Sequence, residues 1–307
     1  MKNGNSVFDR LTYKRKGVVF LIPCIDVVCY WAGSAFDRIN GIVDFYEQSL
    51  AVIGKAIRFY QTETMAQAAP LKKDSLGLIP FWFRKTKSRR DVYILLLESG
   101  ESANDVSDSA FAFQAIEAGD ESTGYIRLIL PVSFIDKDAD KLLEFAERLI
   151  QRLDFGFGQA GYSLNWNEIG QSAELATATM TTLAKRYPGL DLSDPGSTQY
   201  TAADGIKCVN WLTIINESSC EHLGGIKKLE KELGEDIHIH RLPRGVMIQA
   251  GPRPEIGDVN RRQTLPLYHQ VGRVLAPIRS SEHPAFLTVN GVEDDDATNE
   301  WLSRFDT

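Results

Sequence analysis

An apolar run over residues 17–31 constrains the fold of this chain more than any other feature of its sequence. Its β-branched and aromatic side chains are typical of a buried strand, and we predict a core β-strand over residues 18–30. Asp26 lies inside the run, which is too short and too broken to cross a bilayer.

The flanks of this run imitate a secretion signal. Basic residues at 14–16 precede it, and small residues at 32–35 resemble a cleavage site. A polar lead of sixteen residues stands before the run, however, and this argues against a signal. We therefore expect a cytoplasmic chain, with a periplasmic location as the alternative.

Strand-like apolar runs alternate with segments of helical periodicity along the rest of the chain. Strands are predicted at residues 92–97, 110–118, 125–134, 155–164, 208–215, 237–240 and 246–249. Helices are predicted at residues 36–57, at 138–153 after a cap at Asp136, at 167–186, from a capping box at 218–221 through Leu233, and from Thr264 and Pro266 to Ile278.

Both halves of the chain repeat the order strand, helix, paired strands, helix. The predicted class is therefore α+β, with two related units of antiparallel sheet and helices packed on one face. The units cover residues 1–190 and 205–307, and the polar segment 191–204 connects them. One compact two-lobed domain is the alternative.

Charge and cysteine usage narrow the classes of function. The net charge is −7 and the isoelectric point is about 5.4, which argues against a nucleic-acid binder and favours a basic partner. The four cysteines form neither a CxxC pair nor a dense ladder, so free thiols in a reducing cytoplasm are expected. No segment has the length of a transmembrane helix, and no membrane partner is expected.

His238 and His240 are the best metal candidates in the sequence. Alternate residues of a strand point to the same side, so the two imidazoles could share an ion. A third ligand would have to come from Cys220, His222 or His269. An ordinary surface pair is the preferred interpretation, and a metal-dependent enzyme is the alternative.

A basic cluster at residues 84–90 follows the aromatic residues 81–83. An exposed loop beside core aromatic residues explains it, and a phosphate- or nucleic-acid-binding module is the alternative. The sequence has no GxSxG elbow, HExxH motif, EF-hand loop or GxGxxG loop. We therefore predict no catalytic residue, no bound metal and no cofactor.

An acidic run, Glu293, Asp294, Asp295 and Asp296, precedes an aromatic segment near the C-terminus. Carboxylates at this place suit the start of a helix, because they complement its dipole. The same residues are our candidates for docking a basic partner.

Several stretches together resemble a bacterial family, the immunity proteins of the type VI secretion system. The stretches are Val209–Asn216, His222-Leu-Gly-Gly225, Val246–Gly251, Pro254-x-x-Gly257-Asp258, Pro266-Leu-Tyr268 and Leu275-Ala-Pro277, and the resemblance is densest from about residue 205 to 280. It implies a protein without enzymatic activity that binds and neutralises an antibacterial toxin.

The matched residues are expected to maintain the fold rather than to contact the toxin. They are Trp211, Gly224, Gly225, Gly251, Pro254, Gly257, Asp258 and Tyr268. Glycines 224 and 225 suit a close helix–strand approach, Trp211 fills the core, and Asp258 holds its loop.

The resemblance and the acidic charge together predict an antidote that covers a basic effector without chemistry. A nuclease is the first expectation, because a nuclease needs a cationic surface to hold phosphates. An effector that acts on membrane or cell wall is the alternative, and a homodimer is an open alternative to a monomer.

Overall fold

The computed structural model describes residues 7–85, 89–136, 138–166, 171–289 and 291–307. The strands are β1 (Tyr13–Arg15), β2 (Val18–Ala32), β3 (Phe59–Thr62), β4 (Ala69–Pro70), β5 (Val92–Glu98), β6 (Ala110–Ile116), β7 (Thr123–Leu130), β8 (Phe157–Trp166), β9 (Asp191–Leu192), β10 (Leu212–Asn216), β11 (Ile237–Leu242), β12 (Gly245–Ala250), β13 (Thr288–Val289) and β14 (Val292–Glu293). The helices are α1 (Ile39–Ile53), α2 (Leu78–Pro80), α3 (Asp140–Ile150), α4 (Gln171–Arg186), α5 (Pro195–Thr198), α6 (Glu217–His222), α7 (Ile226–Leu233), α8 (Pro266–Leu275) and α9 (Asp295–Leu302).

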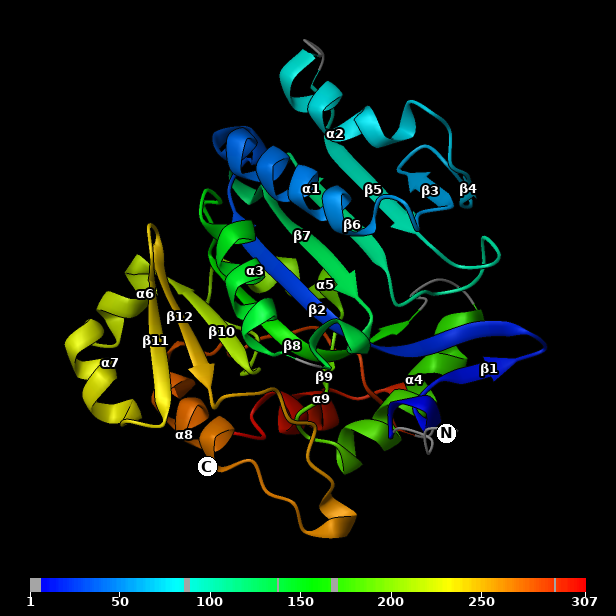
Figure 1. Cartoon of the computed structure of the whole chain (residues 1–307). Coiled ribbons are helices and arrows are strands. Elements are labelled where there is room, and N and C mark those ends of the chain that lie inside the picture. Colours follow the sequence, from blue (N-terminus) through cyan, green and yellow to red (C-terminus); the bar gives the residue numbers. More distant parts are fainter. Residues whose placement is uncertain (1–6, 86–88, 137, 167–170, 290) are drawn as a thin grey trace.

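One large sheet runs through the molecule, in the order β11-β12-β10-β8-β2-β7-β6-β5-β3-β4 (Figure 1). Neighbouring strands of this path are antiparallel, β1 adds to β2, and β9 adds parallel to β8. The predicted α+β class is therefore confirmed. Strands of both predicted units share this sheet, and the division of the chain into two units stays a prediction.

The predicted strand at residues 18–30 is the central strand β2, with β7 on one side and β8 on the other. Its residues 24–31 are almost completely buried, which explains why the run is apolar except for Asp26. Among the described residues, the helices are all too short or too polar to cross a membrane.

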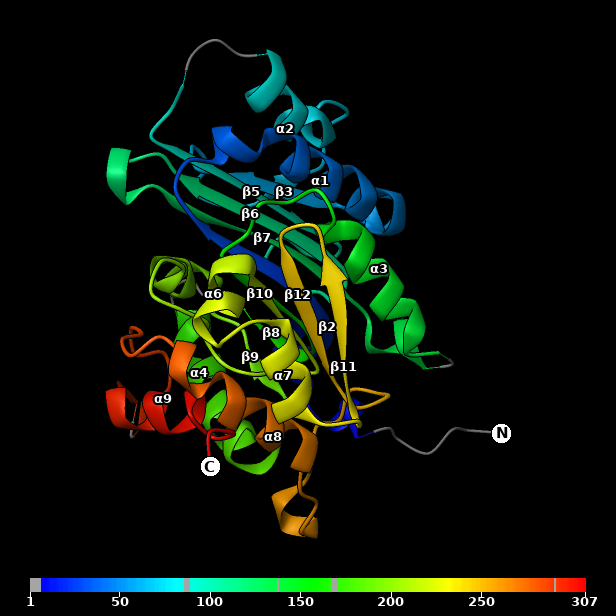
Figure 2. The same ribbon diagram turned by 90° about the vertical axis from the view of Figure 1, so that its left-hand side faces the viewer.

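The two faces of the sheet are covered differently. Helices α1 and α3 lie side by side on one face (Figure 1), where the Tyr46 ring of α1 packs against Phe111 with the centroids 5.0 Å apart. Because side chains alternate along a strand, Phe111 and Phe113 point to this face and Ala110 and Ala112 to the other. On the far half of the sheet, α6, α7 and α8 lie together beside β10 and β12 (Figure 2).

Three predicted helix starts are wrong. Helix α3 follows Ala139 and not a cap at Asp136, and α8 begins after Leu265 instead of Thr264. The capping box at 218–221 lies inside α6, because β10 runs directly into the helix and Asn216 caps it by accepting from the Ser219 N–H at 2.8 Å. Strand β10 also begins at Leu212 rather than at residue 208.

The predicted connection at residues 191–204 contains β9, α5 and a 3₁₀ turn, and most of its residues are buried. Its polar side chains bond to one another and to β8, so their polarity does not require contact with water.

Candidate functional site

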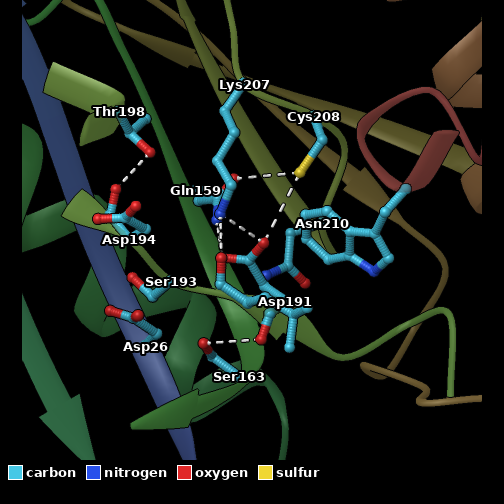
Figure 3. A network of polar contacts seen from close by, with 12 residues as sticks. Asp26, Gln159, Ser163, Asp191, Ser193, Asp194, Thr198, Lys207, Cys208 and Asn210 are labelled. Atoms are coloured by element: carbon cyan, nitrogen blue, oxygen red, sulfur yellow. Dashed lines mark hydrogen bonds and ion pairs between the residues drawn. The ribbon is translucent and has the colours of Figure 1, made fainter. Parts of the chain in front are cut away.

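A buried polar network fastens residues 191–208 to the sheet (Figure 3). The Nζ of Lys207 lies 2.9 and 3.1 Å from the carboxylate oxygens of Asp191 and donates to the Leu192 carbonyl at 2.6 Å. Gln159 of β8 donates to the same carboxylate, and the Lys207 and Asp191 side chains are both fully buried. The amino-acid pattern around residue 207 gives no signal for this pair, which sequence reasoning missed.

This network is built for holding the fold. Burial, with the nearby Asp191 carboxylate, raises the pKa of the Cys208 thiol, so the sulfur stays protonated at neutral pH. A catalytic thiol needs the opposite shift and access to a substrate. The pair therefore fixes the packing of β9 against β8.

A second buried ion pair joins the central strands. Arg127 of β7 contacts one oxygen of Asp26 through Nε and Nη2, both at 2.8 Å, and donates to Asn165 at 3.3 Å. The Asn165 amide donates in turn to the Ser107 carbonyl at 2.8 Å. This pair explains the charged residue that interrupts the apolar run of β2.

Beside this second pair lies a cleft of about 540 Å³ on the sheet face opposite α1. Its floor includes Leu96, Ala110, Ala112 and Arg127 from three neighbouring strands. Segments near residues 59–68 and the loop at 103–106 form its walls. The cleft is within the size range of ligand-binding sites in proteins.

Glu98, at the end of β5, also lines this cleft. One of its carboxylate oxygens accepts from the Ser107 hydroxyl at 2.5 Å. Burial raises the pKa of Glu98 to about 7, while the Ser107 hydrogen bond and the Arg127 charge oppose that rise. Sequence reasoning missed Glu98 because nothing in the local pattern separates it from a surface carboxylate.

The two candidate metal ligands on β11 have different surroundings. His240 contacts Gln249 at 2.9 Å and the Glu147 carboxylate at 3.4 Å, while His238 is exposed. His269 contacts the Thr307 carbonyl at 2.9 Å instead. In the part of the chain that the structure describes, no three His, Cys, Asp or Glu side chains are grouped to hold a metal ion.

The three arginines of the basic cluster, Arg84, Arg89 and Arg90, have partners within the fold. The Arg89 guanidinium lies 4.1 Å from the centre of the Phe36 ring, and Arg90 pairs with Glu63. Arg84 approaches Glu47 at 3.9 Å on the surface. Residues 86–88, which include another cation of the cluster, lie outside the described residues.

The acidic run marks the start of helix α9, as one of its two interpretations predicted. Asp294 caps the helix by accepting from the Ala297 N–H at 2.7 Å, and Asp295 and Asp296 occupy its first turn. Glu293 belongs to β14 and is exposed. Asp295 also borders a second hollow that Asp204 and Glu282 line as well.

Comparison with known proteins identifies the family of this chain. The TsiV family, described as type VI immunity for VRR-NUC, matches residues 41–305. The chain belongs to the TsiV family. It is therefore an immunity protein of the type VI secretion system, and a nuclease as its target fits the family name.

The solved structures agree with this membership at the level of the fold. The chain is similar to the Pseudomonas aeruginosa T6SS protein PA0821, with a TM-score of 0.82 and 19% sequence identity over 94% of this chain and 83% of that one. No curated protein matches the sequence.

Trp211 and Tyr268, two of the residues that carry the resemblance to the immunity family, contact the loop at 251–258. Trp211 is fully buried, and its indole N–H donates to the Gly251 carbonyl at 2.8 Å. The Tyr268 hydroxyl accepts from the Glu255 N–H at 3.2 Å, and Pro254 is buried in the same loop. These contacts support a structural role for the matched residues.

Asp258 and the two neighbouring glycines, Gly224 and Gly225, act in different parts of the fold. Asp258 receives two hydrogen bonds from Arg186, at 3.1 and 3.0 Å, and these hold the pKa of its carboxyl below the ordinary value. Gly224 and Gly225 have φ of 97° and 84°, where α6 ends and α7 begins, so the predicted continuous helix is two helices. A Cβ on Gly225 would meet open space, so φ rather than close approach requires this glycine.

Proposed function

We propose that this TsiV protein neutralises a VRR-NUC effector by binding it and covering the surface that holds DNA, without any chemical step. The observation that carries the proposal is the family match over residues 41–305. Covering is sufficient, because a nuclease that cannot approach the phosphate backbone cannot cleave it.

The charge of the chain supports a cationic target surface. The net charge is −7, and exposed carboxylates gather at the start of α9, where Glu293, Asp295 and Asp296 are solvent-accessible. Opposite charges raise the rate of association, which suits an antidote that must capture its toxin before damage accumulates. We therefore propose residues 293–296 as part of the docking surface for a basic nuclease.

We propose a cytoplasmic location for this protein, because a DNA-cleaving effector acts where the DNA is. A homodimer would form most simply through β11, which lies at the edge of the sheet and can pair with a second copy. Light scattering of the purified protein measures this assembly.

DNA binding by a catalytically inactive VRR-NUC effector tests the mechanism. In a gel-shift assay, equimolar TsiV protein is expected to abolish the shift of labelled DNA by the effector. A stable ternary complex of DNA, effector and TsiV protein would contradict occlusion. The mass of the effector is measured after DNA release. A changed mass would show that the TsiV protein modifies the effector, and this would contradict the absence of chemistry.

A further inference from the structure

The cleft on the sheet face opposite α1 follows from the amino-acid pattern of β6. This strand alternates aromatic residues toward the helices with Ala110 and Ala112 toward the cleft. On the neighbouring strand β5, Ile94 and Leu96 of the same face are partly exposed, whereas Tyr93, Leu95 and Leu97 of the helix-covered face are buried. The short side chains of Ala110 and Ala112 therefore leave room on this face, and Pro195 of α5 lies at its border.

Some charged side chains in the cleft have partners of opposite charge, and Glu98 does not. Arg127 is paired with Asp26, and Glu63 is paired with Arg90. Asp105 accepts from the backbone of Val19 at 2.9 Å and of Ser102 at 2.8 Å. Among the described residues, Glu98 forms no salt bridge, and its hydrogen bonds come from neutral groups of Ser107, the hydroxyl and the backbone N–H.

An unmatched carboxylate in such a place is costly when ionised. Burial accordingly raises the pKa of Glu98 to about 7. A cation that enters the cleft would favour the ionised form, and the apolar side chains of β5 would contact the aliphatic stem of a lysine or arginine.

We propose that this cleft receives a lysine or arginine side chain of the VRR-NUC effector and that Glu98 pairs with its charge. The inference rests on the proposed function, and it names the contact through which the effector is held. A nuclease presents such cations toward the phosphates of DNA. A side chain captured in the cleft is therefore withdrawn from DNA while it anchors the complex.

Two variants test the cleft, with the purified, catalytically inactive effector as ligand. Glu98→Gln keeps the shape of the side chain and removes its negative charge. Ala112→Tyr places a large side chain on the floor of the cleft and reduces its volume. Matched controls are Glu235→Gln and Ala51→Tyr, which alter exposed residues outside the cleft. Isothermal titration calorimetry at pH 8 gives the dissociation constants, and circular dichroism melts establish that each variant is folded.

Glu98→Gln is expected to weaken binding by at least about tenfold, because truncating one partner of a buried ion pair is expensive. Ala112→Tyr should weaken it as much or more, and the controls should bind like the wild type. Between pH 8 and pH 6 the wild type should lose about tenfold in affinity as Glu98 takes up a proton, whereas Glu98→Gln should lose less.

The outcomes separate this inference from the proposed function. If the wild type does not bind the effector, the proposed function fails. If the wild type binds and Glu98→Gln binds equally well at both pH values, the cleft inference is overturned while occlusion stands. Should Ala112→Tyr fail to fold, the isosteric Glu98→Gln variant and its pH dependence still decide the question.

Discussion

At the scale of single residues, the most consequential feature is the buried Lys207–Asp191 pair. Replacing Lys207 by Met would leave the Asp191 carboxylate buried without its cation. We expect a loss of about 3–5 kcal/mol in the free energy of unfolding. Lys228→Met, on the exposed surface of α7, is the control and should stay within about 0.5 kcal/mol of the wild type. Equal urea midpoints for the two variants would show that the pair does not hold the fold.

Asp258 gives a pH-dependent prediction at the same scale. Its folded pKa is lowered by Arg186, so its stabilising contribution is present above the unfolded pKa of about 3.9 and is lost as the pH falls through the folded value. Asp258→Asn should therefore lower the denaturation midpoint at pH 7. The difference from the wild type should shrink below about pH 4, and a difference independent of pH would refute the ion-pair account.

At the scale of elements, the long periodic segments could be predicted and their ends could not. The apolar run of β2 and the three- and four-residue spacing of α1 identify these elements because each buries one continuous surface. The start of α6 could not be predicted, because its cap, Asn216, is also the last residue of β10. Helix ends depend on single hydrogen bonds, which several polar residues near one end can supply.

The candidate sites were harder to predict than the elements. The acidic run and the residues of the family resemblance stand out in the sequence, whereas the cleft does not. Glu98, Ala112 and Arg127 come from three strands, and the strand pairing of β5, β6 and β7 brings them together. In the sequence, a buried polar residue such as Lys207 cannot be distinguished from a solvent-exposed one, because its partners are not known.

Replacing the two histidines of β11, His238 and His240, distinguishes a binding role from metal-dependent chemistry. His240 contacts Gln249 and Glu147, and His238 is exposed. Replacing both histidines by Asn should leave protection of effector-exposed cells unchanged, within about twofold in survival, because surface substitutions have small effects on stability. Loss of protection by a folded double variant, or stoichiometric zinc in the purified wild type, would count against a purely binding role.

At the scale of the whole molecule, the net charge of −7 predicts how the complex forms. Association with a basic effector should slow by about tenfold or more as salt rises, while dissociation changes much less. Replacing Asp294, Asp295 and Asp296 by Asn should reproduce part of that slowing, and surface plasmon resonance over a salt series measures both rates. An association rate indifferent to salt would contradict a basic docking partner, and a triple variant with wild-type kinetics would place the docking surface elsewhere.

The most direct test of the account is a titration of the active VRR-NUC effector with this protein while DNA cleavage is followed. Binding without chemistry predicts that activity falls in proportion to added protein and reaches zero at a fixed stoichiometric ratio. The effector's mass should be unchanged, and its activity should return after the two proteins are separated. Full cleavage in the presence of excess protein, or complete inactivation by a small fraction of an equivalent, would contradict the account.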